Sequence, residues 1–297
     1  MISTEAKSQR SDISFEGYDS PEEMIAAIQS RKDRSYSGYN YLNGDRVYRA
    51  EWSGFKSKAD LEEKMLVGIG DAEQVAIASD FANKMAGERL RRARMKVSVA
   101  GSRAVIPSVL IGRPDCRVRM VRPQVGKKIV RITVDVGINC SITPEQYLRV
   151  GKIIASAVAA LEADNCKVRL DVASATVFDR DYGNSRPHIM CMRMNVKDID
   201  YPMNISQFMF WCGSSAVNRG ISFNWRVTHD RFRSNYVAGM GYSIGVFGNK
   251  YDDDIEYLRE NYFMDGVYLN MEKLIKACGR MKDEEASEYI QALMLGE

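Results

Sequence analysis

The chain has 297 residues, of which 45% are hydrophobic and 27% are charged, and its net charge is +3. This composition is typical of a folded globular protein and excludes a disordered or fibrous chain. No apolar run approaches the roughly 18 residues of a membrane span, and the first residues lack the apolar core of a signal peptide. We therefore expect a cytosolic protein without a membrane partner.

Charge is distributed unevenly along the chain. The segment 84–131 contains 14 Lys and Arg against 2 acidic residues, so the rest of the chain carries a net charge of −9. A basic segment of this kind is a candidate surface for a nucleic acid or another partner. Its candidate contact residues are Arg89, Arg91, Arg92, Arg94, Arg113, Arg117, Arg119 and Arg122. The first four end a predicted helix, where the helix dipole also favours cations for purely structural reasons.

The six cysteines stand singly, without a C-x-x-C pair. We interpret them as small buried apolar residues, and the missing ligand spacing argues against a zinc site. The only two histidines, His188 and His229, stand in no pattern typical of Ser-His-Asp or Cys-His catalysis.

The predicted elements of the first half begin after a polar segment, 1–19, which we expect to be a mobile tail or a single docked extension. The capping box Ser20-Pro21-Glu22-Glu23 then predicts the start of a helix. The other predicted elements are a tyrosine-containing loop at 31–43, a strand at 47–52, helices ending near 67 and 95, and short strands at 97–99 and 116–121.

The clearest signals lie between residues 127 and 178. They predict a strand at 127–136, a helix that begins with the capping box Thr143-Pro144-Glu145-Gln146, and a strand at 167–178. The following turn is too short for a crossover helix, so the strand at 188–196 should run antiparallel to 167–178. The remaining predicted elements are a helix from 202 to near 220, strands at 221–228 and 242–247, and helices beginning at 252 and spanning 267–278 and 282–294.

This order predicts an α/β fold with a mixed, mostly parallel sheet, one antiparallel edge hairpin and an N-terminal α+β extension. We expect three regions: the tail 1–19, the α+β region 20–126 and the α/β core 127–297. No linker rich in Pro, Gly and Ser separates the last two, so we expect 20–126 to wrap the core. The sequence decides neither whether 20–126 folds independently nor the oligomeric state.

The block Ile132-Thr-Val-Asp135-Val-Gly137-Ile-Asn139, followed by a long helix and a hairpin, resembles the first half of a von Willebrand factor A-type domain. The match in layout covers about 127–250. That family places a metal-ligating Asp-x-Ser-x-Ser at this strand-to-helix turn, so the resemblance implies a Mg²⁺ site at Asp135.

Two of the expected metal ligands differ from that motif. Gly137 and Asn139 stand in place of the serines, and a glycine offers no side-chain oxygen to an octahedral Mg²⁺. Asn139 could supply a carbonyl, and Ser141 or Thr143 a hydroxyl. The alternative is that Asp135 caps the turn and that the protein holds no cofactor.

Two motifs in the first half resemble a family of tailed-bacteriophage proteins that is known only as a domain of unknown function. They are Trp52-Ser-Gly54-Phe-Lys-Ser57 and the block 101–116, Gly-Ser-Arg-Ala-Val-Ile-Pro-Ser-Val-Leu-Ile-Gly-Arg-Pro-Asp-Cys. The resemblance covers about two thirds of the chain. It implies a phage origin and a bacterial host cytoplasm, and it assigns no chemistry.

We therefore weigh three functions. The leading hypothesis is a phage-encoded, non-enzymatic binding or scaffold protein with a protein partner, because the metal motif is degenerate and no Gly-x-Ser-x-Gly signature is present. The first alternative is nucleic-acid binding through 84–131. The second is a metal-dependent hydrolase or nuclease at Asp135 with another carboxylate, from Asp171, Asp198 or Asp230. Gly239-x-Gly241-x-x-x-Gly245 lacks the Lys-Ser/Thr of a phosphate loop and is predicted to be a glycine-rich hairpin.

Overall fold

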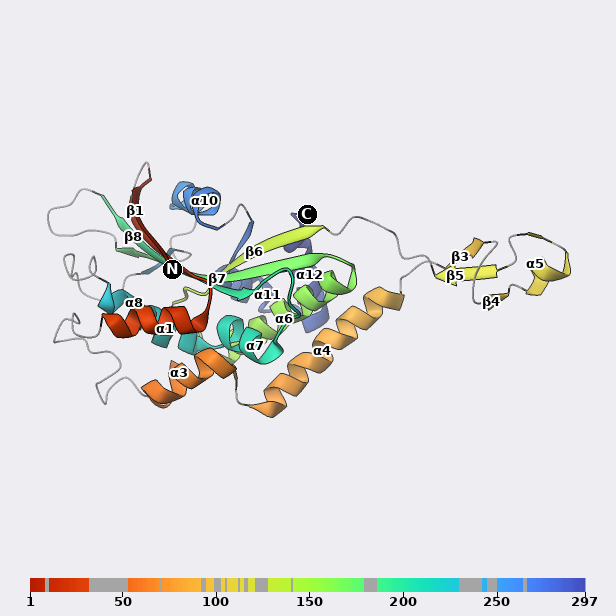
Figure 1. The fold of residues 1–297 in the computed structure, drawn as a ribbon, viewed down its shortest axis with the longest axis horizontal. Helices are drawn as coiled ribbons and strands as arrows, with labels where there is room; N and C mark the ends of the chain where they lie inside the picture. The colour runs from red at the N-terminus through yellow and green to blue at the C-terminus, as the bar shows by residue number, and fades with distance from the viewer. Residues whose placement is uncertain are drawn as a thin grey trace.

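The computed structural model describes residues 1–8, 11–31, 53–69, 71–91, 95–98, 103–104, 106–111, 113–114, 117–120, 128–139, 141–178, 186–229, 242–244, 250–263 and 266–296. In these residues a mixed sheet has the strand order β1-β2-β8-β7-β6-β10, and β9 pairs with β7 (Figure 1). The predicted α/β fold is confirmed. The strands are β1 Ile2–Lys7, β2 Asp12–Tyr18, β6 Ile129–Asp135, β7 Lys167–Phe178, β8 His188–Lys197, β9 Tyr242–Ser243 and β10 Val267–Asn270.

The strand directions follow the prediction around β6 and β7. Strands β7, β6 and β10 are mutually parallel, and β8 returns antiparallel to β7, with Phe178 opposite His188. The predicted hairpin is therefore present. It lies inside the sheet and not at its edge, because β2 pairs parallel with β8 and β1 pairs antiparallel with β2.

Of the two expectations for 1–19, the described residues fit the docked extension, because β1 and β2 are strands of the main sheet. Strand β2 is buried over most of its length, with Ile13 and Phe15 in an apolar cluster. Ser14 and Glu16 alternate with them, as polar residues do in a half-exposed strand, but here both are buried as well. Some of the partners of these polar groups, among them His188 and Trp225, lie far away in the sequence, and the local pattern could not reveal them.

Helices cover the two faces of the sheet unequally. One face carries most of the helices, whose apolar residues form one large cluster with those of β6 and β7, and α10 Asp252–Asn261 packs on the other face (Figure 1). The helices of the first face are α1 Pro21–Ser30, α3 Lys58–Val67, α4 Ala72–Arg91, α6 Pro144–Ala163, α7 Ile205–Gly213, α8 Phe223–Thr228, α11 Met271–Cys278 and α12 Asp283–Leu295. Among the described residues, no helix is both long and apolar enough to cross a membrane.

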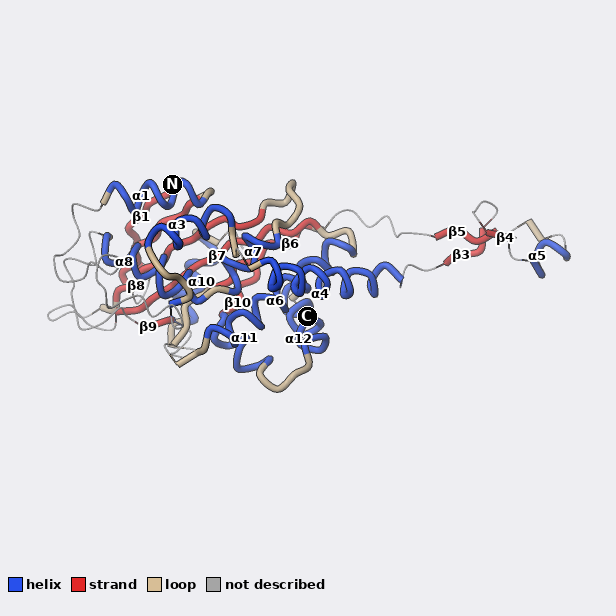
Figure 2. Tube along the Cα trace, turned by 90° about the horizontal axis from the view of Figure 1, so that it is seen from below, coloured by secondary structure: helices blue, strands red, loops and turns tan. Residues whose placement is uncertain are grey.

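Helix α6 is the central helix of this layer, and α4 runs beside it (Figure 2). Its predicted capping box is confirmed, since the Thr143 hydroxyl accepts from the Gln146 N–H and the Gln146 side chain accepts from the Thr143 N–H. Within α6, a Cβ added at Gly151 would lie 2.4 Å from the Gly213 Cα atom. Gly151 therefore permits close contact between α6 and α7.

Two predicted elements have the wrong type. The segment 221–228 is helical, with a π-helical turn at Val217–Ser222 followed by α8, and is not a strand. Ser222 and Arg226 are four residues apart and share one helix face, where they meet Ser174 of β7 at 2.6 and 3.0 Å. The start of the predicted helix at 267–278 is strand β10, which pairs parallel with β6.

A second, three-stranded antiparallel sheet lies between α4 and β6 in the sequence. It consists of β3 Met95–Ser98, β4 Arg103–Ala104 and β5 Arg117–Met120, and the short helix α5 Ile106–Leu110 connects β4 to β5. We call the described residues of 95–120 the arm. Figure 1 shows the arm beyond the C-terminal end of α4, whereas α1, α3 and α4 contribute residues to the main core.

Several predictions fall outside the described residues. These are the loop at 32–43, the strand at 47–52, most of the glycine-rich segment 239–245, and Arg92, Arg94, Arg122 and Asp230.

Candidate functional site

Asp135 ends strand β6 and is fully buried. Its Oδ1 atom accepts from the backbone N–H groups of Gly137 at 2.9 Å and Ala175 at 3.3 Å. Its Oδ2 atom accepts from the Tyr268 hydroxyl at 2.6 Å and from the Asn270 amide at 3.2 Å. Burial raises the pKa of Asp135 to about 6, although these hydrogen bonds act in the opposite direction. Asp135 therefore joins the end of β6 to β7 and to β10.

This geometry does not fit a Mg²⁺ ion at Asp135. A carboxylate offers about four acceptor positions, and here four donors occupy them. Mg²⁺ requires an octahedron of oxygen ligands, whereas the groups around this carboxylate are N–H and O–H donors. Gly137 adds no side-chain oxygen, and within the described residues no group of three His, Cys, Asp or Glu could hold a metal. The arrangement instead agrees with the alternative of a turn-capping aspartate.

The other two predicted metal ligands are used locally. The Asn139 Oδ1 atom accepts from the Ser141 N–H at 3.0 Å, which stabilises the turn before α6. The Asn139 N–H donates to the Glu272 Oε2 atom at 3.1 Å, and the Lys276 ammonium lies 2.7 Å from Glu272 Oε1. Glu272 and Lys276 are thus part of this site, although the sequence alone did not indicate them. Both residues lie on α11, which directly follows β10. A correct prediction of β10 beside β6 could have placed them near the Asp135 turn.

The proposed second carboxylates do not converge on Asp135. Asp171 lies on β7, but it interacts with β8, where Asn195 donates to it at 2.8 Å and Arg193 lies at 3.7 Å. Asp135 accepts hydrogen bonds from β10, and in the sheet β10 and β8 lie on opposite sides of β7. Asp198 accepts from its neighbour Ile199 at 2.6 Å. These contacts of Asp171 and Asp198 therefore do not include Asp135, and Asp230 lies outside the described residues.

A second buried polar cluster surrounds Glu16 of β2. Its carboxylate accepts two hydrogen bonds from Arg31 at 2.7 and 3.0 Å, one from the Trp225 indole at 2.7 Å and one from the Tyr18 hydroxyl, and it lies 3.4 Å from His229. Burial raises the pKa of Glu16, but hydrogen bonds, above all from His229 and Arg31, outweigh it and hold this pKa far below the ordinary value. The cluster fastens β2 to α1 and α8.

The candidate arginines divide between α4 and the arm. Arg89 and Arg91 lie in the last turns of α4, as the helix-dipole interpretation requires. Arg117 and Arg119 lie on β5, and Arg113 precedes that strand. Arg113 and Arg117 are exposed. Lys84, the first residue of the basic segment, forms an ion pair with Glu284 of α12 at 2.9 Å.

The arm carries an apolar tip that the charge pattern did not reveal. Four large side chains in and next to α5 are exposed, with exposed fractions of 68% for Ile106, 48% for Val109, 79% for Leu110 and 71% for Ile111. Soluble proteins rarely leave such a group of apolar side chains in water unless it binds something. The tip is therefore the strongest candidate for a contact surface in the described residues.

Together these features define a mixed α/β protein with a closed, internally hydrogen-bonded strand end and a basic arm with an apolar tip. The model of a family described as Domain of unknown function (DUF7192) matches residues 5–293, and the chain belongs to this family. The predicted membership in an uncharacterised family is thus confirmed. No curated protein and no solved structure matches the chain.

Proposed function

We propose that this chain is a non-enzymatic binding protein that contacts a protein partner through the arm, with the α/β body as its support. The observation that carries the proposal is the exposed apolar tip, Ile106, Val109, Leu110 and Ile111. Protein interfaces commonly combine an apolar centre with a polar rim. The arginines next to the tip would form such a rim, with Arg113 and Arg117 exposed.

The Asp135 site supports the non-enzymatic part of this proposal, because internal hydrogen bonds occupy its carboxylate. The resemblance to von Willebrand factor A-type domains supports a binding role as well. Strands β6 and β7, helix α6 between them and the antiparallel β8 follow the layout on which that resemblance rests. The resemblance to tailed-phage proteins suggests that the protein is phage-encoded and works in the bacterial host.

Site-specific photo-crosslinking in producing cells tests the proposal. A photoreactive residue at position 110 should give a crosslinked protein product, because Leu110 is the most exposed residue of the tip. The same residue at position 201 serves as a matched control, since Tyr201 is 72% exposed but lies on the body, in the turn after β8. Equal products from both positions, or no protein product from position 110, would contradict the proposal.

A nucleic-acid partner is the second candidate, and the exposed Arg113 and Arg117 on the arm favour it. Phosphate contacts would give an affinity that is tolerant of sequence and falls with salt. In fluorescence-anisotropy titrations, the wild type should then bind DNA or RNA at low salt. Arg113→Ala/Arg117→Ala should bind more weakly and show a smaller salt slope, by about 2 if both arginines contact phosphates. A flat titration with single-stranded and double-stranded forms excludes this candidate.

A further inference from the structure

We infer that the partner of the arm is a second copy of this chain, and that the copies assemble head to tail. In this assembly the arm tip of one copy docks on the corner between α3 and α4 of the next. We define the α3–α4 corner as the described residues of 63–80, which comprise the end of α3, the connection and the first turns of α4. The inference rests on the proposed function, because it names the partner of the same apolar tip.

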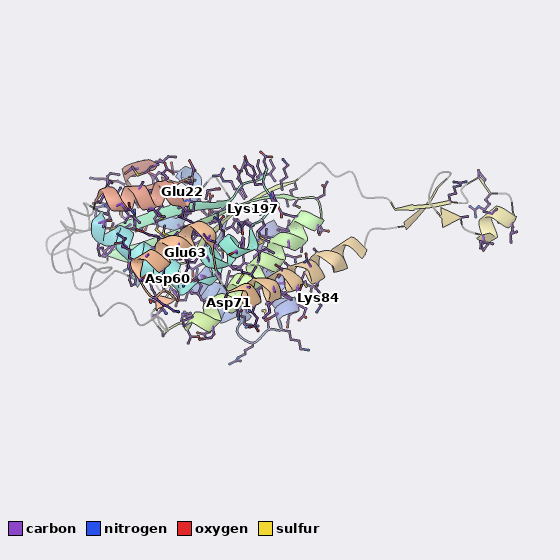
Figure 3. The ribbon with its side chains drawn as sticks, turned by 60° about the horizontal axis from the view of Figure 1, so that its bottom comes forward. Glu22, Asp60, Glu63, Asp71, Lys84 and Lys197 are labelled. Carbon is purple, nitrogen blue, oxygen red and sulfur yellow. The ribbon has the colours of Figure 1, made fainter. Side chains whose placement is uncertain are left out.

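The α3–α4 corner has the features that an apolar, basic arm requires. Leu66 and Val67 at the end of α3 are 40% and 62% exposed, and Ile77 in α4 is 44% exposed. Acidic residues lie in the same segments. They are Glu63, Asp71, Glu73 and Asp80, all exposed, and within the described part of the chain none of them takes part in an ion pair. Figure 3 places Glu63 on α3 and Asp71 at the start of α4, with Lys84 farther along α4.

The arm has the opposite charge. Residues 92–127 contain nine Lys and Arg against one acidic residue. Of the twelve large hydrophobic side chains that are exposed in the described residues, four lie at the arm tip and three at the α3–α4 corner. Apolar surface at both places and opposite charges beside it give the complementarity that selects a partner and its orientation. One chain therefore carries both halves of a matched interface.

The arm is directed away from the corner of its own chain. Helix α4 has 20 residues and is therefore about 30 Å long. The corner includes its N-terminal end, and the arm lies beyond its C-terminal end (Figure 1). An interface between two different surface patches is heterologous, and repeating it produces a ring or an open filament. A second copy therefore meets the arm tip more readily than the same copy does.

Sedimentation velocity and light scattering over a range of concentrations test the inference with two double variants. Leu110→Ser/Ile111→Ser removes apolar surface from the arm tip, and Val67→Ser/Ile77→Ser removes it from the corner, neither with any change of charge. The wild type should assemble as its concentration rises, and less readily at high salt. Each double variant should weaken association by about a hundredfold or more, because two apolar side chains lose their burial. Tyr201→Ser is the matched control and should assemble like the wild type.

Mixing the two double variants gives the decisive result. One variant keeps an intact corner and the other keeps an intact arm, so a 1:1 mixture should form heterodimers and nothing longer. A wild type that stays monomeric overturns the inference, as does a double variant that assembles normally or a mixture that stays monomeric. If the wild type is monomeric but position 110 crosslinks to a different protein, the proposed function stands and the head-to-tail inference falls. If position 110 crosslinks to a nucleic acid and to no protein, both the proposed protein-binding function and the head-to-tail inference fall.

Discussion

Asp135 should make the stability of this protein depend on pH in a direction that is unusual for an aspartate. Burial raises its pKa to about 6, whereas an aspartate in an unfolded chain titrates near about 3.9. Between these pH values the folded protein binds the additional proton, so its stability falls as the pH rises. At about 1.4 kcal/mol per unit of pKa difference, the wild type loses roughly 3 kcal/mol from this group between about pH 4 and pH 6.

The perturbation that isolates this effect is Asp135→Asn, which has a similar shape and cannot titrate. Urea unfolding of both proteins between about pH 4 and pH 7 gives two free energies of unfolding at each pH. Their difference, wild type minus variant, should fall by roughly 3 kcal/mol across this range, whatever its starting value. Contributions from other titrating groups cancel in this difference, because both proteins share them.

A difference that stays constant, or that grows with pH, would refute the reasoning. Growth with pH would mean that the folded protein stabilises the carboxylate, as a bound cation would, and Mg²⁺ should then raise the melting temperature of the wild type but not of the variant.

Tyr268→Phe provides a second check. The Tyr268 hydroxyl lowers the pKa of Asp135, so its removal should move the loss of stability to higher pH. Tyr289→Phe, at an exposed position of α12, is the matched control.

Three further predictions concern packing and the N-terminal strands. Gly151→Ala should destabilise the protein by about 2 kcal/mol in urea unfolding, because the new methyl group meets backbone at 2.4 Å, whereas Gly213→Ala meets a flexible methionine at 3.1 Å and should cost less. Glu16→Gln should lower the free energy of unfolding by about 3 kcal/mol or more, because it removes the buried carboxylate that accepts two hydrogen bonds from the charged Arg31 guanidinium. The folded pKa of Glu16 is depressed, so this difference should shrink as the pH falls below about 4, and a constant difference would contradict the role given to its charge. Deletion of residues 1–18 should yield aggregated protein in size-exclusion chromatography, since it exposes the edge of β8, and a soluble monomer with native circular dichroism would count against β2 as a structural strand.

Local sequence was sufficient where a signal and its structural cause lie close together. The Thr143 capping box begins helix α6 as its pattern predicts, and Asn165, with a positive φ angle, follows the end of the helix. Strand β7 spans Lys167–Phe178 as expected, and the short turn after it correctly required an antiparallel β8. In each case the determining contact is a hydrogen bond or a steric limit within a few residues.

Local sequence failed where burial depends on distant partners. Strand β2 contains a buried glutamate whose hydrogen-bond donors include Arg31 and, from α8, Trp225. The alternating apolar residues of 221–228 suggest a strand, but Ser222 and Arg226 face Ser174 from a helix. The same holds for the candidate site. The Asp135 motif is visible in the sequence, but two of its four donors, Tyr268 and Asn270, lie 133 and 135 residues away on a strand that the sequence predicts to be a helix.

By itself, the sequence determined the α/β class, the strand-helix-strand-strand order of the core and the presence of a basic segment. Periodicity, capping residues and charge are properties of neighbouring positions, and they act on the chain before it folds. Only the tertiary structure decided that the Asp135 carboxylate is closed by internal donors and that the apolar tip lies on an arm beyond α4. The physical reason is that burial and hydrogen-bond satisfaction are properties of the folded chain, since they depend on which distant residues replace water around each group.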